Sequence, residues 1–350
     1  MSGRFDSRTR RTALIVVAVV LLALSGCIGD DGASGDGEEI ETEQPTGELE
    51  IHHVDVGQAD AALVVTPSGE TILIDTGDWR DDGRDVIDYL ERHEVDRIDH
   101  LVATHAHADH IGGHAAVIEH LEEDGEGVGA AYDSGVVHTS GTYDRYLEAV
   151  ETYEVTLFQV AEGDELPLED DATNATVLNP PEGDSGDDLH YNSVALTVEF
   201  GNFSYLTTGD AERDAERRLL EERGDDLAAD VYQAGHHGSS TSSTEPFLDA
   251  VDPQVAVISS AEGSQYGHPH DEVLESFADR GIETYWTGVH GHVVVTTDGE
   301  ETTLETEREA PTDPAELRDH DPGREAIAPS IDGPAAIDPS TAVVSSRSID

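Results

Sequence analysis

The sequence contains no lysine, and its 18 basic residues, all arginine, face 77 acidic ones. The resulting formal net charge of −59 leaves no basic patch with which to attract a polyanion. In ordinary salt such a charge makes a compact chain repel itself, whereas in molar salt the Debye length falls to roughly 3 Å and the repulsion is largely screened. The composition therefore favours a halophilic protein, with a specific acidic partner surface as the alternative.

Cysteine is nearly absent, because Cys27 is the only one, and this excludes a disulfide framework or a cysteine metal site within the chain. Cys27 follows a basic N-terminus and the apolar stretch 13–24, which is too short to span a bilayer comfortably. The tetrapeptide Leu-Ser-Gly-Cys is similar to a lipoprotein signal-peptidase site, and Arg10-Arg11 indicates twin-arginine export. We therefore expect residues 1–27 to be an export signal and Cys27 to carry lipid. The lipid would anchor the protein to the outer face of the cytoplasmic membrane. A buried thiol is the alternative, which the polar run after Cys27 disfavours.

Neither flank of the predicted folded domain contains a long segment with helical or strand periodicity. Residues 28–47 are rich in Gly, Asp, Glu, Ser and Thr, which is typical of a flexible acidic tether. Residues 307–350 are rich in Pro, Ala, Asp and Ser without helical or strand periodicity, so we expect them to be disordered. The predicted folded domain is residues 48–306, which is long enough to bury a substantial core.

Within this domain, short apolar segments alternate with amphipathic ones. The apolar segments predict strands at 48–56, 61–66, 71–77, 100–104, 193–200, 203–210, 230–235, 255–259, 283–288 and 292–299. Apolar residues at helical spacing predict helices at 85–95, 211–224, 245–251 and 271–281, with a further helix starting near residue 114. Hairpins followed by strand–helix alternation in both halves predict an α/β protein. Its expected architecture is a four-layer αββα sandwich, in which two mixed β-sheets pack face to face and helices flank them.

A histidine cluster follows the predicted strand 100–104. His105, His107, Asp109 and His110 lie within six positions, and the glycine pair at 112–113 lets the backbone turn sharply after them. Imidazole nitrogen and carboxylate oxygen are ligands that zinc accepts, at about 2.0–2.2 Å. His105 and His107 can share one metal, while Asp109 and His110 lie further on and can reach a second. A chance cluster in a chain with 18 histidines is the alternative, which the other residues of the set weaken.

Further candidate residues also stand at strand ends. Asp210 follows the strand 203–210, where its carboxylate can bridge two metals or can only cap the next helix. His236 and His237 follow another strand, and one of them is expected to bind metal while the other contacts substrate or transfers a proton. Ser239 can bind a substrate oxygen or can be a simple turn residue.

Asp75 ends a third predicted strand, in the sequence Leu-Ile-Asp-Thr-Gly. Carboxylates behind a metal-binding histidine commonly fix its tautomer, so Asp75 is expected to orient a ligand without touching metal. The alternative is that Asp75 only begins a turn.

These stretches together resemble the motifs of the metallo-β-lactamase superfamily. The resemblance rests on VDVGQADAALVVTPSGETILIDTGD, THAHADHIGG, NSVALTVEFGNFSYLTTGDAE and GHHGSSTSS, which lie between residues 51 and 297. More narrowly, they resemble free-standing relatives of the C-terminal domain of the competence protein ComEC. The resemblance implies an αββα sandwich with two divalent metal ions, usually zinc and with manganese as an alternative, at one edge between the sheets.

The resemblance also implies a ligand set. His105 and His107 would bind the first metal, Asp109 and His110 the second, Asp210 would bridge, and the His236/His237 pair would supply the last ligand. Members of the family often carry one more histidine before the bridging aspartate. Here the corresponding stretch offers His190 and Asn192, and an earlier loop offers His138, so the third protein ligand of the first metal stays open. His268 stands in a late loop that resembles the family's and is expected to line the site.

The resulting functional hypothesis is a hydrolase in which a hydroxide bridging two metals attacks phosphorus or a carbonyl carbon. The histidine of the 236/237 pair that does not bind metal would protonate the leaving group, and we assign catalytic roles to Asp109 and His237. The ComEC-like motifs favour a phosphodiester outside the cell, including single-stranded DNA. A carbonyl substrate such as a lactone, thioester or β-lactam is one alternative, and a non-catalytic lipid-tethered binding protein is another.

Overall fold

Two mixed β-sheets form the centre of the computed structural model, which describes residues 45–183 and 185–320. The first sheet has eight strands in the order β14 (Thr302–Thr306), β13 (Val293–Thr297), β1 (Leu49–His53), β2 (Ala62–Val65), β3 (Thr71–Ile74), β4 (Arg97–Val102), β5 (Gly127–Asp133) and β6 (Thr156–Gln159). The second has six in the order β12 (Glu283–Trp286), β11 (Val255–Ile258), β10 (Val231–Gln233), β9 (Phe203–Thr207), β8 (Ala195–Phe200) and β7 (Thr173–Asn179). In both sheets an antiparallel hairpin precedes a run of parallel pairs, from β3 to β6 and from β9 to β12, and the first sheet is completed by the antiparallel strands β13 and β14.

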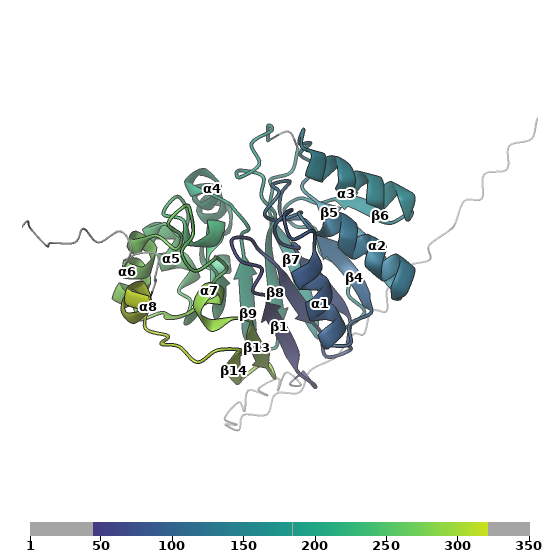
Figure 1. Cartoon of the computed structure of the whole chain (residues 1–350). Helices are drawn as coiled ribbons and strands as arrows, with labels where there is room; N and C mark the ends of the chain where they lie inside the picture. Colours follow the sequence, from purple (N-terminus) through teal and green to yellow (C-terminus); the bar gives the residue numbers. More distant parts are fainter. Residues whose placement is uncertain (1–44, 184, 321–350) are drawn as a thin grey trace, which may run out of the picture. The chain divides into compact units, whose positions relative to one another are not determined.

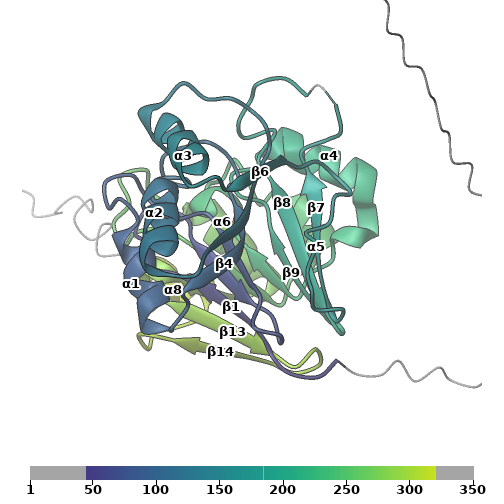
Figure 2. The ribbon, with the colours of Figure 1, turned by 90° about the vertical axis from the view of Figure 1, so that its right-hand side faces the viewer.

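Helices cover the outer faces of the two sheets (Figure 1). They are α1 (Arg84–Arg92), α2 (His114–Asp124), α3 (Gly141–Thr152), α4 (Arg213–Arg223), α5 (Glu245–Val251), α6 (Asp271–Arg280), α7 (Thr287–His290) and α8 (Pro314–His320), with short 3₁₀ helices η1 (Gly224–Leu227) and η2 (Gly235–Gly238). Figures 1 and 2 both show α1, α2 and α3 together beside the first sheet, and α4 and α5 on the side of the second. The predicted four-layer αββα sandwich is confirmed.

Side-chain alternation explains why the inner strands are apolar throughout. Ile72 and Ile74 of β3 pack between the two sheets, whereas Leu73 faces the helices α1 to α3. A strand buried on both faces needs apolar residues at every position, as parallel strands of α/β proteins do. The predicted hairpins at 67–70 and 201–202 connect β2 to β3 and β8 to β9, as expected.

Two boundaries differ from the sequence prediction. The strand predicted at 292–299 is the shorter β13, Val293–Thr297, which pairs with β1 in the first sheet, where β14 forms the edge. The folded domain was predicted to end at 306, with a disordered tail from 307. The structure instead continues to residue 320, because Thr284 donates its N–H to the carbonyl of Thr312 and Leu317 of α8 is fully buried. Residues beyond 320 lie outside the described part of the chain.

The described residues include no helix that combines the length and the apolar character needed to cross a membrane. The expected lipidation site Cys27, the export signal and most of the tether lie outside the described residues.

Candidate metal centre

The candidate site lies where strands of both sheets end. Asp75 directly follows β3, and His105 comes three positions after β4. Asp210 comes three positions after β9, and His236 three positions after β10. Since β3 and β4 run parallel, as do β9 and β10, their carboxyl ends bring residues distant in sequence together. The position agrees with the general rule that α/β proteins bind ligands at the carboxyl ends of their strands.

Asp210 is fully buried and contacts histidines through both carboxylate oxygens. Its Oδ1 lies 3.1 Å from Nε2 of His110 and 3.8 Å from Nε2 of His237. Its Oδ2 lies 3.6 Å from Nε2 of His105 and 3.5 Å from Nε2 of His236. A carboxylate that faces two histidine groups is suited to bridge two cations. The alternative role as a helix cap does not apply, because the residue that caps α4 is Glu212.

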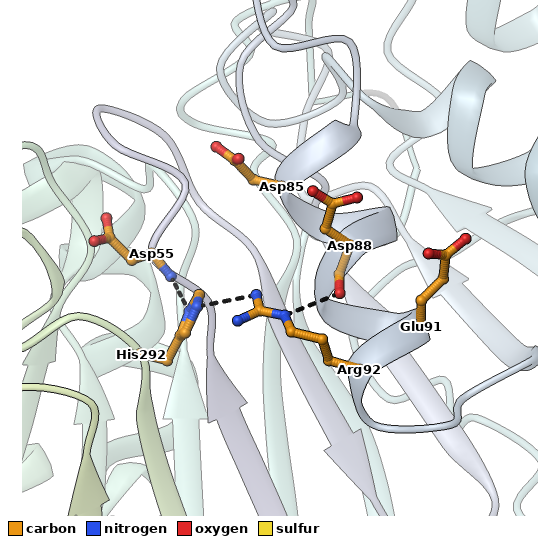
Figure 3. A pocket seen from close by; sticks show the side chains of 6 residues that line it. All are labelled: Asp55, Asp85, Asp88, Glu91, Arg92 and His292. Carbon is orange, nitrogen blue, oxygen red and sulfur yellow. Dashed lines mark hydrogen bonds between the residues drawn. The ribbon is translucent and has the colours of Figure 1, made fainter.

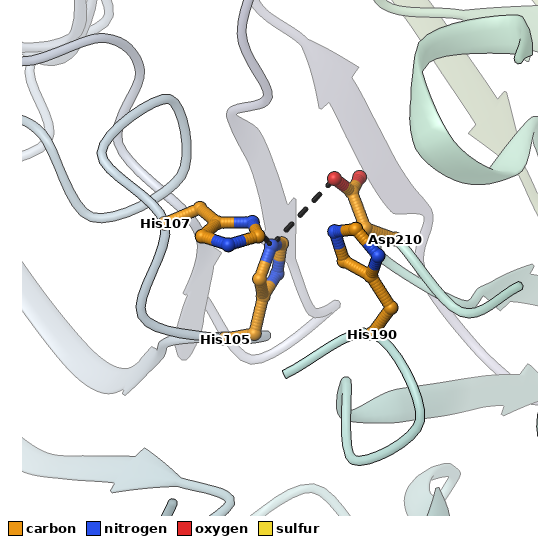
Figure 4. Close-up of side chains that lie close together, drawn as sticks. All are labelled: His105, His107, His190 and Asp210. Atoms are coloured by element: carbon orange, nitrogen blue, oxygen red, sulfur yellow. Dashed lines mark hydrogen bonds and ion pairs between the residues drawn. The ribbon is translucent and has the colours of Figure 1, made fainter. Parts of the chain in front are cut away.

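The first histidine group is formed by His105, His107, His190 and Asp210, whose ligand atoms all lie within 4.8 Å of one another (Figure 4). His105 is buried and its Nε2 lies 2.8 Å from Nδ1 of His107. The His190 ring centroid lies 4.9 Å from that of His107. His190 thus supplies the third imidazole of this group. The sequence left the third protein ligand open among His190, Asn192 and His138.

The second group is formed by Asp60, His110, Asp210 and His237, all of them buried. Within the described residues, Nε2 of His110, Nε2 of His237 and Oδ1 of Asp210 have no hydrogen-bond partner. Leaving buried polar atoms unpaired is unfavourable by roughly 1–3 kcal/mol each. Three such atoms that converge on one point fit a bound cation, so the residues present are suited to the metal that the sequence predicts.

Both histidines of the second group have their Nδ1 atoms held by oxygen acceptors. Nδ1 of His110 lies 2.7 Å from Oδ2 of Asp75, and Nδ1 of His237 donates to the carbonyl of Ser259 at 3.0 Å. When either ring is neutral, its hydrogen therefore resides on Nδ1 and its lone pair is at Nε2, toward Asp210. This is the tautomer that a metal ligand requires.

Asp75 lies behind His110, where the sequence analysis expected an orienting carboxylate. It is buried, and it also accepts hydrogen bonds from the backbone N–H and the hydroxyl of Thr104, at 2.8 Å and 2.6 Å. Its backbone is in the left-handed region, with φ of 60°. Asp75 therefore fixes both the His110 ring and the chain that leads to His105.

Asp60 is a site residue that the sequence analysis did not single out. Its Oδ1 lies 3.5 Å from Nδ1 of His237 and its Oδ2 lies 3.8 Å from Nδ1 of His110, so the carboxylate contacts the Nδ1 side of both rings. The available signal was an aspartate directly before the apolar run of β2, where a buried charge needs a partner.

Burial and charge act in opposite directions on the titrating groups of the metal-free site. Burial would raise the pKa of Asp210, but the charges of His110, His237 and His105 outweigh it and hold that pKa well below its usual range. Burial would lower the pKa of His110, but the charges of Asp210 and Asp75 raise it well above normal. Burial, followed by the charges of His190 and His110, lowers the pKa of His107 to about 4. His107 of the first group is therefore a neutral imidazole, whereas His110 and Asp210 of the second group form a charged pair.

The backbone at His236 and His237 is constrained. Both lie in η2 with positive φ, 51° and 56°, which is unfavourable for residues other than glycine by roughly 1–2 kcal/mol each. The turn directs His237 into the buried second group, whereas His236 stays partly exposed. His236 contacts Oε1 of Glu212 through Nδ1 at 3.3 Å, and His190, Glu212 and His236 form a third cluster at the rim of the first group.

Glycine at 112 and 113 is required for close approach. A Cβ at Gly112 would lie 2.1 Å from the backbone nitrogen of Trp79, and one at Gly113 would lie 2.5 Å from the carbonyl of Thr76. Neither glycine has positive φ, but both lie in the turn that precedes α2, as expected. The glycines let the histidine loop pack directly on the loop that follows β3.

The remaining predicted residues lie around the centre with different roles. Oδ2 of Asp109 lies 3.5 Å from Nε2 of His237, at the exposed rim of the second group. The ring centroid of His138 lies 5.9 Å from that of His107, and that of His268 lies 6.3 Å from that of His237, so both line the site.

Asn192 and Ser239 do not face the histidine groups. The Asn192 side chain donates to the carbonyl of Asp188 at 2.8 Å and accepts from the hydroxyl of Ser185, which shapes the loop that carries His190. Ser239 Oγ lies 3.0 Å from the hydroxyl of Thr241, in agreement with the alternative of a turn residue.

A separate acidic hollow lies between α1, the loop that follows β1 and the residue that precedes β13 (Figure 3). It measures about 610 Å³ and is lined by Asp55, Asp85, Asp88, Glu91, Arg92 and His292. Nδ1 of His292 accepts from the backbone of Asp55 at 3.0 Å, and its Nε2 lies 3.3 Å from the Arg92 guanidinium. His292 is the only imidazole among the residues that line this hollow, and it faces hydrogen-bond donors at both ring nitrogens. The hollow therefore does not offer the set of ligands found in the histidine groups.

Comparison with known proteins agrees with this geometry. The chain is 29% identical over 262 residues to ComE operon protein 3 of Bacillus subtilis (strain 168), which covers 70% of this chain and 33% of the relative. It is 31% identical over 247 residues to competence protein ComA of Neisseria gonorrhoeae, covering 71% of this chain and 32% of the relative. The chain thus spans about a third of the length of the curated relatives it matches.

Solved structures show a more distant likeness. The metallo-β-lactamase fold protein YhfI from Bacillus subtilis matches with a TM-score of 0.45 and 13% identity, covering 68% of this chain and 95% of that one. A diphosphatase of the PhnP family matches with a TM-score of 0.43 and 17% identity, covering 71% and 98%. The family model described as the metallo-beta-lactamase superfamily matches residues 54–262, and it includes the histidine cluster, His190, Asp210 and the His236/His237 pair. The chain belongs to the metallo-β-lactamase superfamily.

Proposed function

We propose that the protein is a metal-dependent phosphodiesterase that holds two divalent ions, zinc or manganese, and acts on single-stranded DNA or a related phosphodiester outside the cell. The observation that carries the proposal is Asp210, whose two oxygens face two separate histidine groups. His105, His107 and His190 would hold the first ion and His110 and His237 the second, with Asp210 between them. Ions bound there would supply Lewis acidity toward water and toward a phosphoryl oxygen.

The proton for the leaving oxygen has a different source from the one the sequence favoured. His237 is buried in the second group, with Nδ1 bonded to the carbonyl of Ser259. His236 is partly exposed, and its Nδ1 is held by the hydroxyl of Thr241 at 3.1 Å and faces Glu212. We therefore give the role of proton donor to His236 and the role of ligand to His237. Asp109, at the rim beside His237, would contact the second ion from its exposed side.

The substrate class is supported by the relatives, one of which is named competence protein ComA. A paired metal centre of this kind can also catalyse acyl transfer. The assay must therefore distinguish a phosphodiester substrate from a carbonyl substrate. The strong acidity of the chain is compatible with a polyanionic substrate only where salt screens the charges, so the assay belongs in molar salt.

The test uses purified protein in molar sodium chloride with zinc or manganese, offered bis-p-nitrophenyl phosphate, single-stranded DNA and nitrocefin. We expect phosphodiester cleavage, two metal ions per chain by elemental analysis, and loss of both in Asp210→Ala. Asp214→Ala is the matched control, because its side chain is 73% exposed on α4 and pairs with Arg217 at the surface. Cleavage of nitrocefin alone would refute the substrate class, and fewer than two ions would refute the paired centre.

The location outside the cell rests on the N-terminal segment. We propose that Cys27 carries the lipid that holds the protein at the outer face of the cytoplasmic membrane. Cys27→Ser should release the protein into the medium, as measured by immunoblotting of membrane and medium fractions. Unchanged retention in the membrane fraction would contradict the lipid anchor.

A further inference from the structure

A cavity of about 390 Å³ opens beside the candidate metal centre. Among the residues that line it are Gln58, Trp79, Arg80, Asp109, Gln265 and Tyr266. Asp109 belongs to the rim of the second histidine group, so the cavity is continuous with the centre. Its wall is formed by the loop after β3 and the loop between β11 and α6, which lie far apart in the sequence.

The aromatic side chains of this cavity are exposed. In the described part of the chain four large hydrophobic residues are exposed, and two of them, Trp79 at 47% and Tyr266 at 59%, line this one cavity. Aromatic residues make up only 5% of the sequence. Two exposed aromatic rings in a cavity next to a hydrolytic centre are suited to hold a ring of the substrate by stacking.

Both rings are tied to the candidate centre. The backbone N–H of Trp79 donates to the carbonyl of Ala108 at 2.9 Å, directly before Asp109. The Tyr266 ring centroid lies 5.8 Å from that of His268, which in turn lies 6.3 Å from that of His237. A ring held between Trp79 and Tyr266 is therefore a near neighbour of any group bound at the second histidine group.

The charged side chains that line the cavity are the carboxylates of Asp78, Asp81 and Asp109 and the guanidinium of Arg80, so the cavity is suited to a neutral ring and leaves the phosphate to the metal centre. The Arg80 guanidinium carbon lies 5.1 Å from the Trp79 ring centroid, where it would repel a quaternary ammonium. The nearby carboxylates are already engaged, since Asp78 pairs with Arg80 at 2.9 Å and Asp81 accepts the backbone N–H of Asp85 at 2.8 Å. The amides of Gln58 and Gln265 offer donors and acceptors of the kind that bind the polar edge of a base.

We propose that this aromatic subsite binds a nucleobase of the substrate strand next to the phosphodiester at the metal centre. The inference rests on the proposed phosphodiesterase function and adds the residues that would recognise the base of its substrate. Stacking of a base on an aromatic side chain tolerates any sequence, because every base has a π face. The subsite therefore gives a preference for nucleotides without a preference for one base.

Binding can be measured without catalysis. The sequence has two tryptophans, and Trp286 is buried at 1% exposure, so quenching of fluorescence by thymidine 5′-monophosphate in molar salt reports Trp79. We expect saturable quenching with this probe and none with inorganic phosphate or phosphocholine. Stacking contributes about 1–3 kcal/mol per base, so Trp79→Leu should weaken binding by about tenfold or more in calorimetry. Trp79→Phe should retain most of the affinity, because it keeps an aromatic face.

Phe158 on β6 provides the matched control. It is 48% exposed and does not line the cavity, so Phe158→Leu should leave nucleotide binding unchanged. Equal affinities of wild type and Trp79→Leu, or quenching by phosphocholine in place of the nucleotide, would overturn the assignment. An oligothymidylate that binds more tightly than the mononucleotide points to a strand as the ligand, and equal affinities point to a free nucleotide. Both outcomes support a nucleobase subsite.

Turnover separates the subsite from the proposed function. The p-nitrophenyl ester of thymidine 5′-monophosphate and methyl p-nitrophenyl phosphate share a leaving group and differ in the nucleoside. We expect wild type to prefer the nucleotide ester, and Trp79→Leu and Tyr266→Leu to lose that preference while still cleaving the methyl ester. Cleavage of both esters with no nucleoside preference in wild type would overturn the subsite alone. Nucleotide quenching without cleavage of either ester would overturn the phosphodiesterase and leave the subsite supported.

Discussion

Asp75→Asn tests whether the orienting carboxylate behind His110 controls the second histidine group. Asp75 accepts three hydrogen bonds, two from Thr104 and one from Nδ1 of His110. Asparagine matches the shape of aspartate and tolerates the left-handed backbone at this position. The substitution therefore changes the chemistry of the contact rather than the fold around it.

The expected loss of metal affinity follows from the hydrogen-bond donors and acceptors that asparagine offers in place of aspartate. An asparagine side chain keeps one acceptor oxygen and places an N–H₂ group where the second oxygen was. If the oxygen stays with the backbone N–H of Thr104, the amide hydrogens face Nδ1–H of His110 and the Thr104 hydroxyl, and the ring must take the tautomer with its hydrogen on Nε2. That hydrogen occupies the position of the metal-binding lone pair. Loss of such an orienting partner lowers metal affinity or activity by about 10–100-fold, which is about 1.4–2.8 kcal/mol.

Zinc affinity measured against a chromophoric chelator gives the direct readout, with elemental analysis after dialysis at limiting zinc. We expect one ion to bind as in wild type and the other to be weakened, because His110 belongs only to the second group. Asp82→Asn is the matched control, since Asp82 is an exposed aspartate with a similar φ of 58°. Zinc binding by Asp75→Asn within twofold of wild type for both ions would refute the orienting role.

Three further predictions test the rest of the centre and its support. His190→Gln removes one imidazole of the first group, so metal content by elemental analysis should fall by one ion with the second group still loaded; two retained ions would contradict its role. Gly112→Ala places a Cβ 2.1 Å from the Trp79 nitrogen and should lower the free energy of unfolding by roughly 3 kcal/mol or more, measured by denaturant titration. Gly141→Ala, with no atom within 4 Å of its added Cβ, should be nearly neutral. Burial and then the charge of His110 lower the pKa of His114 to about 3, so the unfolded state takes up the proton first as pH falls. Its stabilising contribution is complete above about pH 6.5 and is lost between there and about pH 3, and His114→Gln should flatten the loss of unfolding free energy across that window.

The fold could be predicted from the sequence where the residues of a strand themselves have high β propensity. The runs that became β2, β3, β8 and β11 are rich in β-branched residues, and Asp75 and Gly201 directly follow β3 and β8. β5 has the sequence Gly-Val-Gly-Ala-Ala-Tyr-Asp, which has little strand propensity, and its structure comes from pairing with β4 and β6. The helix α8 was missed because its only fully buried apolar anchor is Leu317, and such a contact depends on tertiary packing.

The candidate site could be predicted where ligands are close in sequence. His105, His107 and His110 share one loop after β4, so spacing alone indicated their proximity. His190 is in a loop between β7 and β8, and its approach to His107 depends on how that loop folds back. Asn179 fixes the loop by donating to the carbonyls of Tyr191 and Ser193, at 2.9 Å and 2.7 Å. No spacing rule in the sequence encodes that contact.

Each sheet supplies only part of the candidate metal centre. Asp210 therefore has a larger role in the site than its local sequence indicates. The loops of the first sheet supply Asp75, His105 and His110, and those of the second supply Asp210 and His237. The oxygens of Asp210 contact Nε2 of histidines that come from both sheets. Because these contacts join the sheets at the edge where their parallel strands end, an ion bound to ligands from both would stabilise the sandwich only in its folded state. The position of Asp210 therefore couples the packing of the two sheets to the chemistry between them.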